Sequence, residues 1–402
     1  MTLLCAAGVV DVTPPLGPMA GYGARGDVPA TGVHDRLTAS LLRLGGVCWV
    51  AVDALNVTVA LATRIRTAVA GALGLSPDGV LVCASHTHSG PSAWLRDGPV
   101  TDRLVADTAA GAAGLPAAVP VTAHWAVVPD VGVGGNRYDP AGPHDASAGV
   151  LTLRDADGAV VAVLADYACH PTVLSHRNLA YSADYPATAR RLVRDTVGGV
   201  VLFLQGAAGD VSTRFTRRES SFAEADRHGG LLADALLRGV AAGTPLAGEP
   251  SMRRAARAVP TRALPDAATA ATTLAGTERA WLAVADPASP EGRIARTRYE
   301  GAQLQAALCA EGLPPSLTLP IGVVEFGDVA WAHLPVEPFT CYGERIRAAG
   351  KHPVTRTVGY TDGYFGYLAD ETAHRDGRYE ALGSRFDPAA GDVVVGAAVD
   401  LL

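Results

Sequence analysis

The first 240 residues alternate short apolar runs with longer stretches of helical period, and this alternation restricts the chain to an α/β architecture. Residues 37–44 and 47–52 predict a β-hairpin that turns at Gly45-Gly46. Residues 57–73 repeat apolar side chains with the 3.6-residue period of a helix, and residues 80–84 are typical of a buried strand. Strands and helices in this order predict mixed β-sheets layered with helices.

The alternation continues along the chain with one interruption. Residues 243–315 are rich in Ala, Arg and Pro and predict a possible helical insertion. The other predicted elements are strands 150–153, 160–165, 200–205, 321–326 and 329–334, and helices 186–197, 222–240, 267–284, 291–309 and 339–348. Because no internal repeat and no long linker divides the sequence, we predict one large domain over residues 1–402.

Charge and composition exclude several classes of protein. The chain has 33 Lys and Arg against 40 Asp and Glu, a net charge of -7 and no basic block, so we expect no nucleic-acid partner. We expect no signal peptide, because residues 1–9 have no positive n-region and no cleavage site follows them. We expect no membrane span, because Gly, Pro and His interrupt the longest uncharged run. The six cysteines form no C-x-x-C pair and several lie in apolar runs, which predicts buried thiols and a cytoplasmic location.

Two histidines follow the strand predicted at residues 80–84. They lie in the segment Ser85-His86-Thr87-His88-Ser89-Gly90-Pro91. On an extended backbone, residues i and i+2 project from the same face, so we expect both imidazoles to point into one site. Neutral imidazole is a common zinc ligand, whereas one core histidine and one exposed histidine would be the structural alternative.

Two further segments at strand ends carry reactive side chains. His170 lies in Cys169-His170-Pro171 and is the obvious third imidazole for a metal that needs ligands from separate elements. A Gly-rich turn, residues 205–212, ends at Ser212 and could offer free backbone amides to an anion. Ser212 could be a nucleophile or a hydrogen-bonding group, and a turn without a catalytic role is the alternative.

Several motifs in one order resemble the neutral/alkaline non-lysosomal ceramidases. They are His86-Thr87-His88-Ser89-Gly90-Pro91, Cys169-His170-Pro171-Thr172, Gly209-Asp210-Val211-Ser212 and Arg378-Tyr379-Glu380-Ala381. Residues 19–23 and 32–37 fit as well, so the similarity extends from about Val9 to Asp387. The resemblance implies the catalytic domain of a zinc-dependent amidase acting on linear amides.

The resemblance also implies two more zinc ligands and an arginine that faces the active site. Residues 334–340 resemble the family's P-x-E segment, which makes Glu337 the carboxylate ligand. Residues 364–367 resemble its Y-x-x-Y segment, and Tyr367 then falls on the ligand tyrosine, a choice that the residues alone do not make. Asn136-Arg137 matches the family's Asn-Arg pair. The implied Zn²⁺ ligands are thus His86, His170, Glu337 and Tyr367.

The sequence departs from the family where substrate is handled. Ser212 is followed by Thr213-Arg214 where the family reads Pro-Asn, and residues 368–372 lack the family's Thr-Thr-x-Glu-Glu-Tyr run. These departures leave the implied zinc ligands in place. We therefore expect a small N-acyl amide other than ceramide as the substrate.

The expected mechanism is attack of a zinc-activated water on the acyl carbonyl. His88 would transfer protons or hold the developing oxyanion, Arg137 and Tyr367 would stabilise negative charge, and Ser212 would position the substrate. The same residues allow Ser212 as nucleophile with His88 as base. Two other functions remain open: a cytoplasmic acyltransferase or amide-forming cyclase in small-molecule biosynthesis, and a non-catalytic binding protein. The sequence makes no prediction of the oligomeric state.

Overall fold

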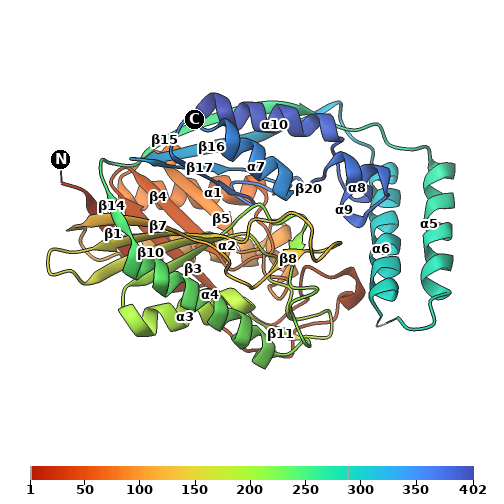
Figure 1. Cartoon of the computed structure of the whole chain (residues 1–402), viewed down its shortest axis with the longest axis horizontal. Coiled ribbons are helices and arrows are strands. Elements are labelled where there is room, and N and C mark those ends of the chain that lie inside the picture. The colour runs from red at the N-terminus through yellow and green to blue at the C-terminus, as the bar shows by residue number, and fades with distance from the viewer. Residues whose placement is uncertain (1, 288) are drawn as a thin grey trace.

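Three β-sheets meet in a common core, and each sheet carries helices on its outer side. The computed structural model describes residues 2–287 and 289–402 (Figure 1). One tryptophan from each sheet lies in the core: Trp49, Trp125 and Trp331. The Trp331 ring meets Trp125 edge-on at 5.1 Å between centroids and Trp49 at 6.4 Å. Such aromatic pairs add about 0.5–1.5 kcal/mol each to the burial of their apolar surface.

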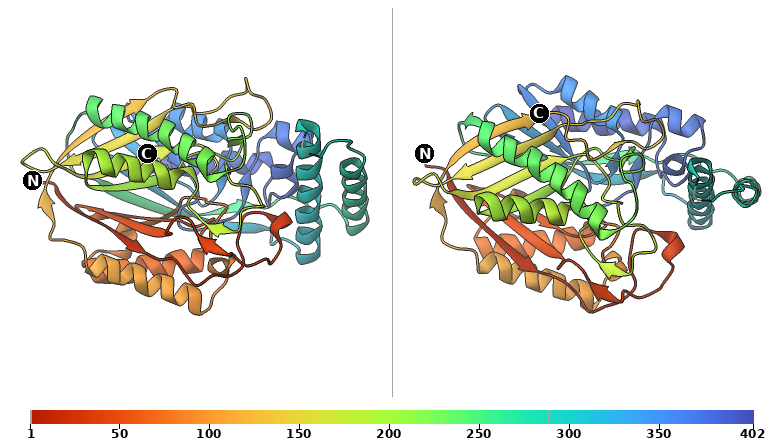
Figure 2. Two further views of the ribbon diagram at one scale, coloured as in Figure 1. Left: turned by 90° about the horizontal axis from the view of Figure 1, so that it is seen from below. Right: turned by 60° about the horizontal axis from the view of Figure 1, so that its bottom comes forward.

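The first sheet is mixed, with β4 (Val47–Val52) and β5 (Val80–Ala84) paired in parallel. In order across the sheet it contains β5, β4, β3 (Thr38–Leu44), β1 (Leu4–Asp11) and β6 (Val119–Pro120). Helices α1 (Val59–Leu73) and α2 (Pro99–Ala113) pack on its outer face, where Figure 2 shows them in orange along the red and orange strands. Thr58 caps α1 by accepting from the Leu61 amide, and Gly74 ends the helix in the left-handed conformation.

The second sheet is also mixed and contains the strand that leads to His170. Its order is β12 (Val200–Gln205), β10 (Val160–Tyr167), β9 (Ala148–Arg154), β7 (Thr122–Val128) and β14 (Thr244–Leu246). Helices α3 (Tyr185–Val197) and α4 (Phe222–Ala242), green in Figure 2, cover its outer face. Strands β10 and β12 are parallel, so their carboxyl ends reach the same edge of the sheet.

The third sheet leads to Glu337. It contains β15 (Ser251–Pro260), β16 (Ser316–Phe326), β17 (Val329–His333) and β19 (Val354–Val358), with α7 (Thr340–Ala349) and α10 (Pro388–Leu401) on its outer face. Between β15 and β16 the chain forms a helical hairpin of α5 (Ala267–Leu282) and α6 (Pro290–Glu311), which stands at one end of the molecule in Figure 1.

Short elements join the sheets near the carboxyl ends of these strands. Parallel pairs join β11 (Ala180–Tyr181) to β2 (Gly32–Val33) and β18 (Glu337–Pro338) to β20 (Tyr367–Leu368), and β13 (Val211–Ser212) runs antiparallel to β8 (Gly135–Asn136). The remaining elements are α8 (Glu371–Arg375), α9 (Tyr379–Leu382) and the 3₁₀ turns Gly23–Arg25, Pro77–Gly79 and Ser92–Leu95.

The predicted architecture of mixed sheets layered with helices is confirmed. The predicted hairpin at Gly45-Gly46 forms, and the predicted strands 150–153 and 160–165 lie in the antiparallel pair β9 and β10. Helices α5 and α6 occupy the segment predicted as a helical insertion. The prediction of one domain over residues 1–402 stays a prediction, and residues 1 and 288 lie outside the described part. The six cysteines are free thiols, four of them buried, and no helix within the described ranges is long and apolar enough to cross a bilayer.

Candidate metal centre and active site

His86 and His88 follow β5, and their ring nitrogens lie close together. The two Nε2 atoms are 3.3 Å apart, while Nδ1 of His86 is 2.7 Å from the Leu55 carbonyl and Nδ1 of His88 is 2.9 Å from the Gly21 carbonyl. The expected extended backbone is wrong here, because His86 has a φ of 65° in the left-handed region. That conformation costs about 1–2 kcal/mol and turns the chain out of the strand direction. Such stored strain is common at functional sites.

His170 follows β10 and is oriented by the Gly-rich turn after β12. Its Nδ1 lies 2.7 Å from the Ala208 carbonyl and 3.2 Å from the Val211 carbonyl. The turn therefore offers carbonyls to a histidine, whereas we expected free amides for an anion. Its Gly206 amide donates to Tyr167, and its Gly209 amide donates to the Pro338 carbonyl.

Glycine at position 209 is required by a close approach of two backbone segments. A Cβ at Gly209 would lie 2.7 Å from the Glu337 carbonyl oxygen, which is closer than carbon and oxygen can pack. The Gly-rich turn thus passes directly against β18. This contact brings the segment that orients His170 next to the segment that carries Glu337.

Glu337 adds a carboxylate to the histidine cluster. Its Oε2 lies 3.0 Å from Nε2 of His170 and 3.3 Å from Nε2 of His86, and its side chain is 1% exposed. Tyr360 donates to Oε2 at 3.3 Å, and Tyr364 donates to Oε1. Two hydroxyl donors satisfy lone pairs that burial would otherwise leave without partners.

The arrangement of donors and acceptors fits a bound cation. A carbonyl only accepts hydrogen bonds, so the Nδ1 atoms of His86, His88 and His170 carry the hydrogens. In its neutral form each imidazole turns the lone pair of Nε2 toward the cluster, and the three histidines' ligand atoms lie within 4.8 Å of one another. Lone pairs facing a carboxylate at this range repel unless a cation lies between them. Imidazoles with one carboxylate are a donor set typical of zinc, whereas Mg²⁺ and Ca²⁺ prefer oxygen.

Burial favours the neutral imidazoles that such a site needs. Desolvation, followed by the positive charge of Arg137, lowers the pKa of His170 to about 3. Desolvation also holds the pKa of His88 well below its usual value. Both rings are therefore uncharged near neutral pH, with lone pairs available for a metal or a proton.

Tyr367 lies beside His170, in the strand that pairs with the Glu337 strand. The parallel pairing sets Glu337 opposite Tyr367, and the Tyr367 ring stacks on His170 with centroids 6.4 Å apart and an interplanar angle of 13°. The predicted tyrosine is thus brought to the cluster. Its role as a ligand stays a prediction.

Arg137 and Ser212 are held together by the pairing of β8 with β13. Arg137 is 7% exposed, and its Nη1 donates to Oε1 of Glu380 at 2.8 Å. The Ser212 hydroxyl accepts from the Arg214 amide at 3.3 Å, and no histidine among the described residues hydrogen-bonds to it. Ser212 therefore lacks the adjacent base that a serine nucleophile needs.

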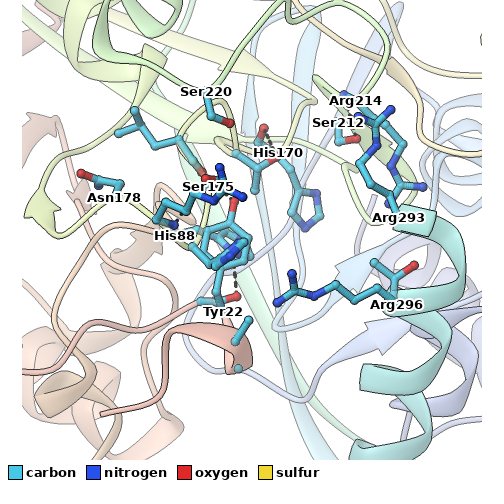
Figure 3. Close-up of a pocket in the computed structure, with 18 of the residues that line it drawn as sticks. Tyr22, His88, His170, Ser175, Asn178, Ser212, Arg214, Ser220, Arg293 and Arg296 are labelled. Atoms are coloured by element: carbon cyan, nitrogen blue, oxygen red, sulfur yellow. Dashed lines mark hydrogen bonds between the residues drawn. The ribbon is translucent and has the colours of Figure 1, made fainter. Parts of the chain in front are cut away.

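One cavity of about 1460 Å³ brings the predicted residues to a common surface. His88, His170, Arg137, Ser212 and Tyr367 all line it. The His88 and His170 rings lie side by side with centroids 5.7 Å apart, and Figure 3 shows Ser212 near Arg214. His86 and Glu337, each 1% exposed, are buried beneath this surface.

Solved structures share the architecture of the whole chain. A structure titled "Ceramidase complexed with C2" matches with a TM-score of 0.79 and 17% identity, over 100% of this chain and 75% of the other. The neutral ceramidase from Pseudomonas aeruginosa matches with a TM-score of 0.77 and 18% identity, over 100% and 74%. The chain has a neutral-ceramidase-like fold. At this identity the likeness concerns the fold, and no family model or curated protein matches the sequence significantly.

Three residues of this site were missed by the sequence analysis. Tyr360 and Tyr364 bind Glu337, although they lie in the same tyrosine-rich segment as Tyr367. Glu380 is 1% exposed and accepts from both Arg137 and the Tyr138 hydroxyl. Glu380 belongs to the segment 378–381 that carried the resemblance, and this membership was the available signal.

Proposed function

We propose that the protein is a zinc-dependent hydrolase of N-acyl amides. The observation that carries the proposal is the convergence of Nε2 of His86, Nε2 of His170 and Oε2 of Glu337 in a buried cluster that opens into a large cavity. Two matched structures are named ceramidases, and a ceramidase cleaves an amide bond. We assign the metal to His86, His170, Glu337 and Tyr367.

The proposed mechanism uses the chain's own residues around that metal. A bound zinc ion would polarise the acyl carbonyl and activate water as the nucleophile. His88 presents the lone pair of Nε2 to the cavity, so it accepts a proton from the attacking water and returns it to the departing amine. The guanidinium of Arg137, oriented by Glu380, stabilises the negative charge that develops on the acyl oxygen.

Substrate and location are part of the same proposal. We propose a small N-acyl amide other than ceramide, because the loop after Ser212 and the residues after Tyr367 depart from the family pattern. Six cysteines without a disulfide among the described residues support a reducing compartment such as the cytoplasm.

Metal analysis tests the proposed centre directly. We expect about one zinc per chain in the purified protein and none in His86→Ala and Glu337→Ala, because each change removes a donor from the cluster. Elemental mass spectrometry of the three proteins, with circular dichroism to check folding, measures this. If the wild type holds no zinc after dialysis against zinc, the proposed zinc-dependent mechanism is wrong.

A Ser212→Ala variant separates water from serine as the nucleophile. Because no histidine bonds to the Ser212 hydroxyl in the described part of the chain, we expect kcat to fall by about tenfold or less. A serine nucleophile would instead be abolished by the change, with a loss of about 10⁴-fold or more. Steady-state kinetics on N-butanoyl amides distinguishes the two. Adding an amine to the same assay tests the acyltransferase alternative by product analysis.

A further inference from the structure

The cavity wall is positively charged although the whole chain is acidic. The net charge is -7, yet seven arginines against four carboxylates line the cavity among the described residues. Two of those carboxylates are already paired, Glu380 with Arg137 and Glu300 with Arg296. The cavity therefore holds an excess of positive charge in the absence of a ligand.

One face of α6 forms a polar side of this cavity. Arg293, Arg296, Thr297 and Glu300 all line it, and their spacing of three, four and seven residues places them on one face of the helix. Figure 3 shows Arg296 reaching from α6 across the cavity. The Nε of Arg293 is buried and has no hydrogen-bond partner in the part of the chain that the structure describes. An alkyl chain against this face would leave these guanidinium groups without partners, which is costly.

The loop after β13 supplies arginines from another side. Arg214, Arg217 and Arg218 line the cavity, and none of them has a carboxylate within 4.0 Å among the described residues. The guanidinium of Arg214 donates to the backbone carbonyl of Arg137, and that of Arg217 donates to the backbone carbonyl of Thr172. Their remaining N–H groups are available to a ligand.

Burial and neighbouring arginines lower the pKa of two basic groups in the cavity. Burial, followed by the charge of Arg137, lowers the pKa of Arg214. Burial, followed by the charges of Arg296 and Arg177, lowers the pKa of His176. A lowered pKa means that the positively charged form of each group is disfavoured in this cavity. A bound anion would relieve that cost and would itself be stabilised by the arginines.

We propose that this cavity binds substrates with an anionic group next to the N-acyl amide, as in an N-acyl amino acid with a free carboxylate. The inference rests on the proposed hydrolase function and names its substrate class. Guanidinium groups bind carboxylate, sulfonate and phosphate oxygens through paired N–H donors, so the shared feature is the anion. Arg293 and Arg296 hold that anion from α6, while the acyl carbonyl faces His88 and His170.

Hydrolysis of matched substrates tests the inference. N-butanoylglycine is compared with N-butanoylglycinamide, which has the same shape but no charge, and the taurine and phosphoethanolamine amides identify the preferred anion. We expect kcat/KM to be higher for the best anion by about tenfold to 100-fold, and the advantage to shrink with added salt. Equal values for the charged and neutral substrates would overturn the inference.

Arginine variants locate the effect. Arg293→Gln and Arg296→Gln should each lower kcat/KM for the preferred anion about tenfold more than for the neutral amide. Arg279→Gln is the matched control, because Arg279 is exposed on α5 and removing it changes the net charge equally. A uniform loss for both substrates, or an equal effect of Arg279→Gln, would contradict a local anion site.

A binding measurement keeps this inference separate from the hydrolase proposal. The ketone analogue of N-butanoylglycine, in which a methylene replaces the amide nitrogen, cannot be hydrolysed. We expect calorimetry on the zinc-loaded protein to show about tenfold tighter binding of this acid than of its carboxamide, and loss of that difference in Arg293→Gln. Selective binding without hydrolysis of any substrate would support the anion site and refute the hydrolase. Hydrolysis without selective binding would do the reverse.

Discussion

A His88→Ala variant is expected to keep its zinc and to hydrolyse N-acyl amides about 10³-fold more slowly, because it removes the proposed proton carrier. His88 lines the cavity with Nδ1 held by the Gly21 carbonyl, which leaves Nε2 as the nitrogen that can exchange a proton. The loss should appear in kcat with little change in KM, since the proton moves only as the reaction proceeds. Metal content and steady-state kinetics measured on one preparation test both halves of the expectation.

The same variant decides between two sets of metal ligands. His88 has its Nε2 only 3.3 Å from that of His86, so a site built from three histidines is the competing arrangement. If His88→Ala loses zinc as completely as His86→Ala, then His88 is a ligand and the assignment of Tyr367 is wrong. His144→Ala is the control, because His144 lies outside the cavity lining and its ring bonds locally to the Gly142 carbonyl. It should change neither zinc content nor kcat.

Local patterns were enough to predict the layered fold and the strand ends where the histidines lie. Buried strands such as β5 and β12 are continuous apolar runs, and helices such as α1 show a clear helical period, so both signals lie in neighbouring residues. His86 and His170 could be chosen because each follows such a run and precedes a proline-containing turn. These are properties of a few consecutive residues.

Contacts between distant segments could not be predicted in this way. Glu337 lies 167 residues beyond His170, and the pairing depends on the third sheet packing against the second. The left-handed backbone at His86 is imposed by the surrounding structure, since histidine itself disfavours it. Tyr360 and Tyr364 reach Glu337 only because the segment after β19 turns back over β18. The resemblance to ceramidases supplied Glu337 and Tyr367, but it assigned no role to Glu380.

An Asp166→Asn variant is expected to lose about 3–5 kcal/mol of unfolding free energy, because it leaves a buried arginine without its main partner. Asp166 is 1% exposed at the carboxyl end of β10 in the second sheet. Its Oδ1 accepts from Nε of Arg356 on β19 at 2.7 Å, and its Oδ2 accepts from Nε1 of Trp331 on β17 at 3.2 Å. These bonds join the second sheet to the third.

The expected loss of unfolding free energy is large because the residues around position 166 have no room to rearrange. A Cβ at Gly149 would lie 2.3 Å from Oδ2 of Asp166, so the side chain fills a tight space. Asp145, at 3.2 Å from Arg356, compensates the charge only in part. Urea unfolding measures the change, and Asp195→Asn, which breaks an exposed pair with Arg194, should cost about 0.5 kcal/mol or less. A loss below about 1 kcal/mol in Asp166→Asn would mean that Asp145 alone neutralises Arg356. The contact between the second and third sheets, which brings His170 next to Glu337, would then depend on apolar packing.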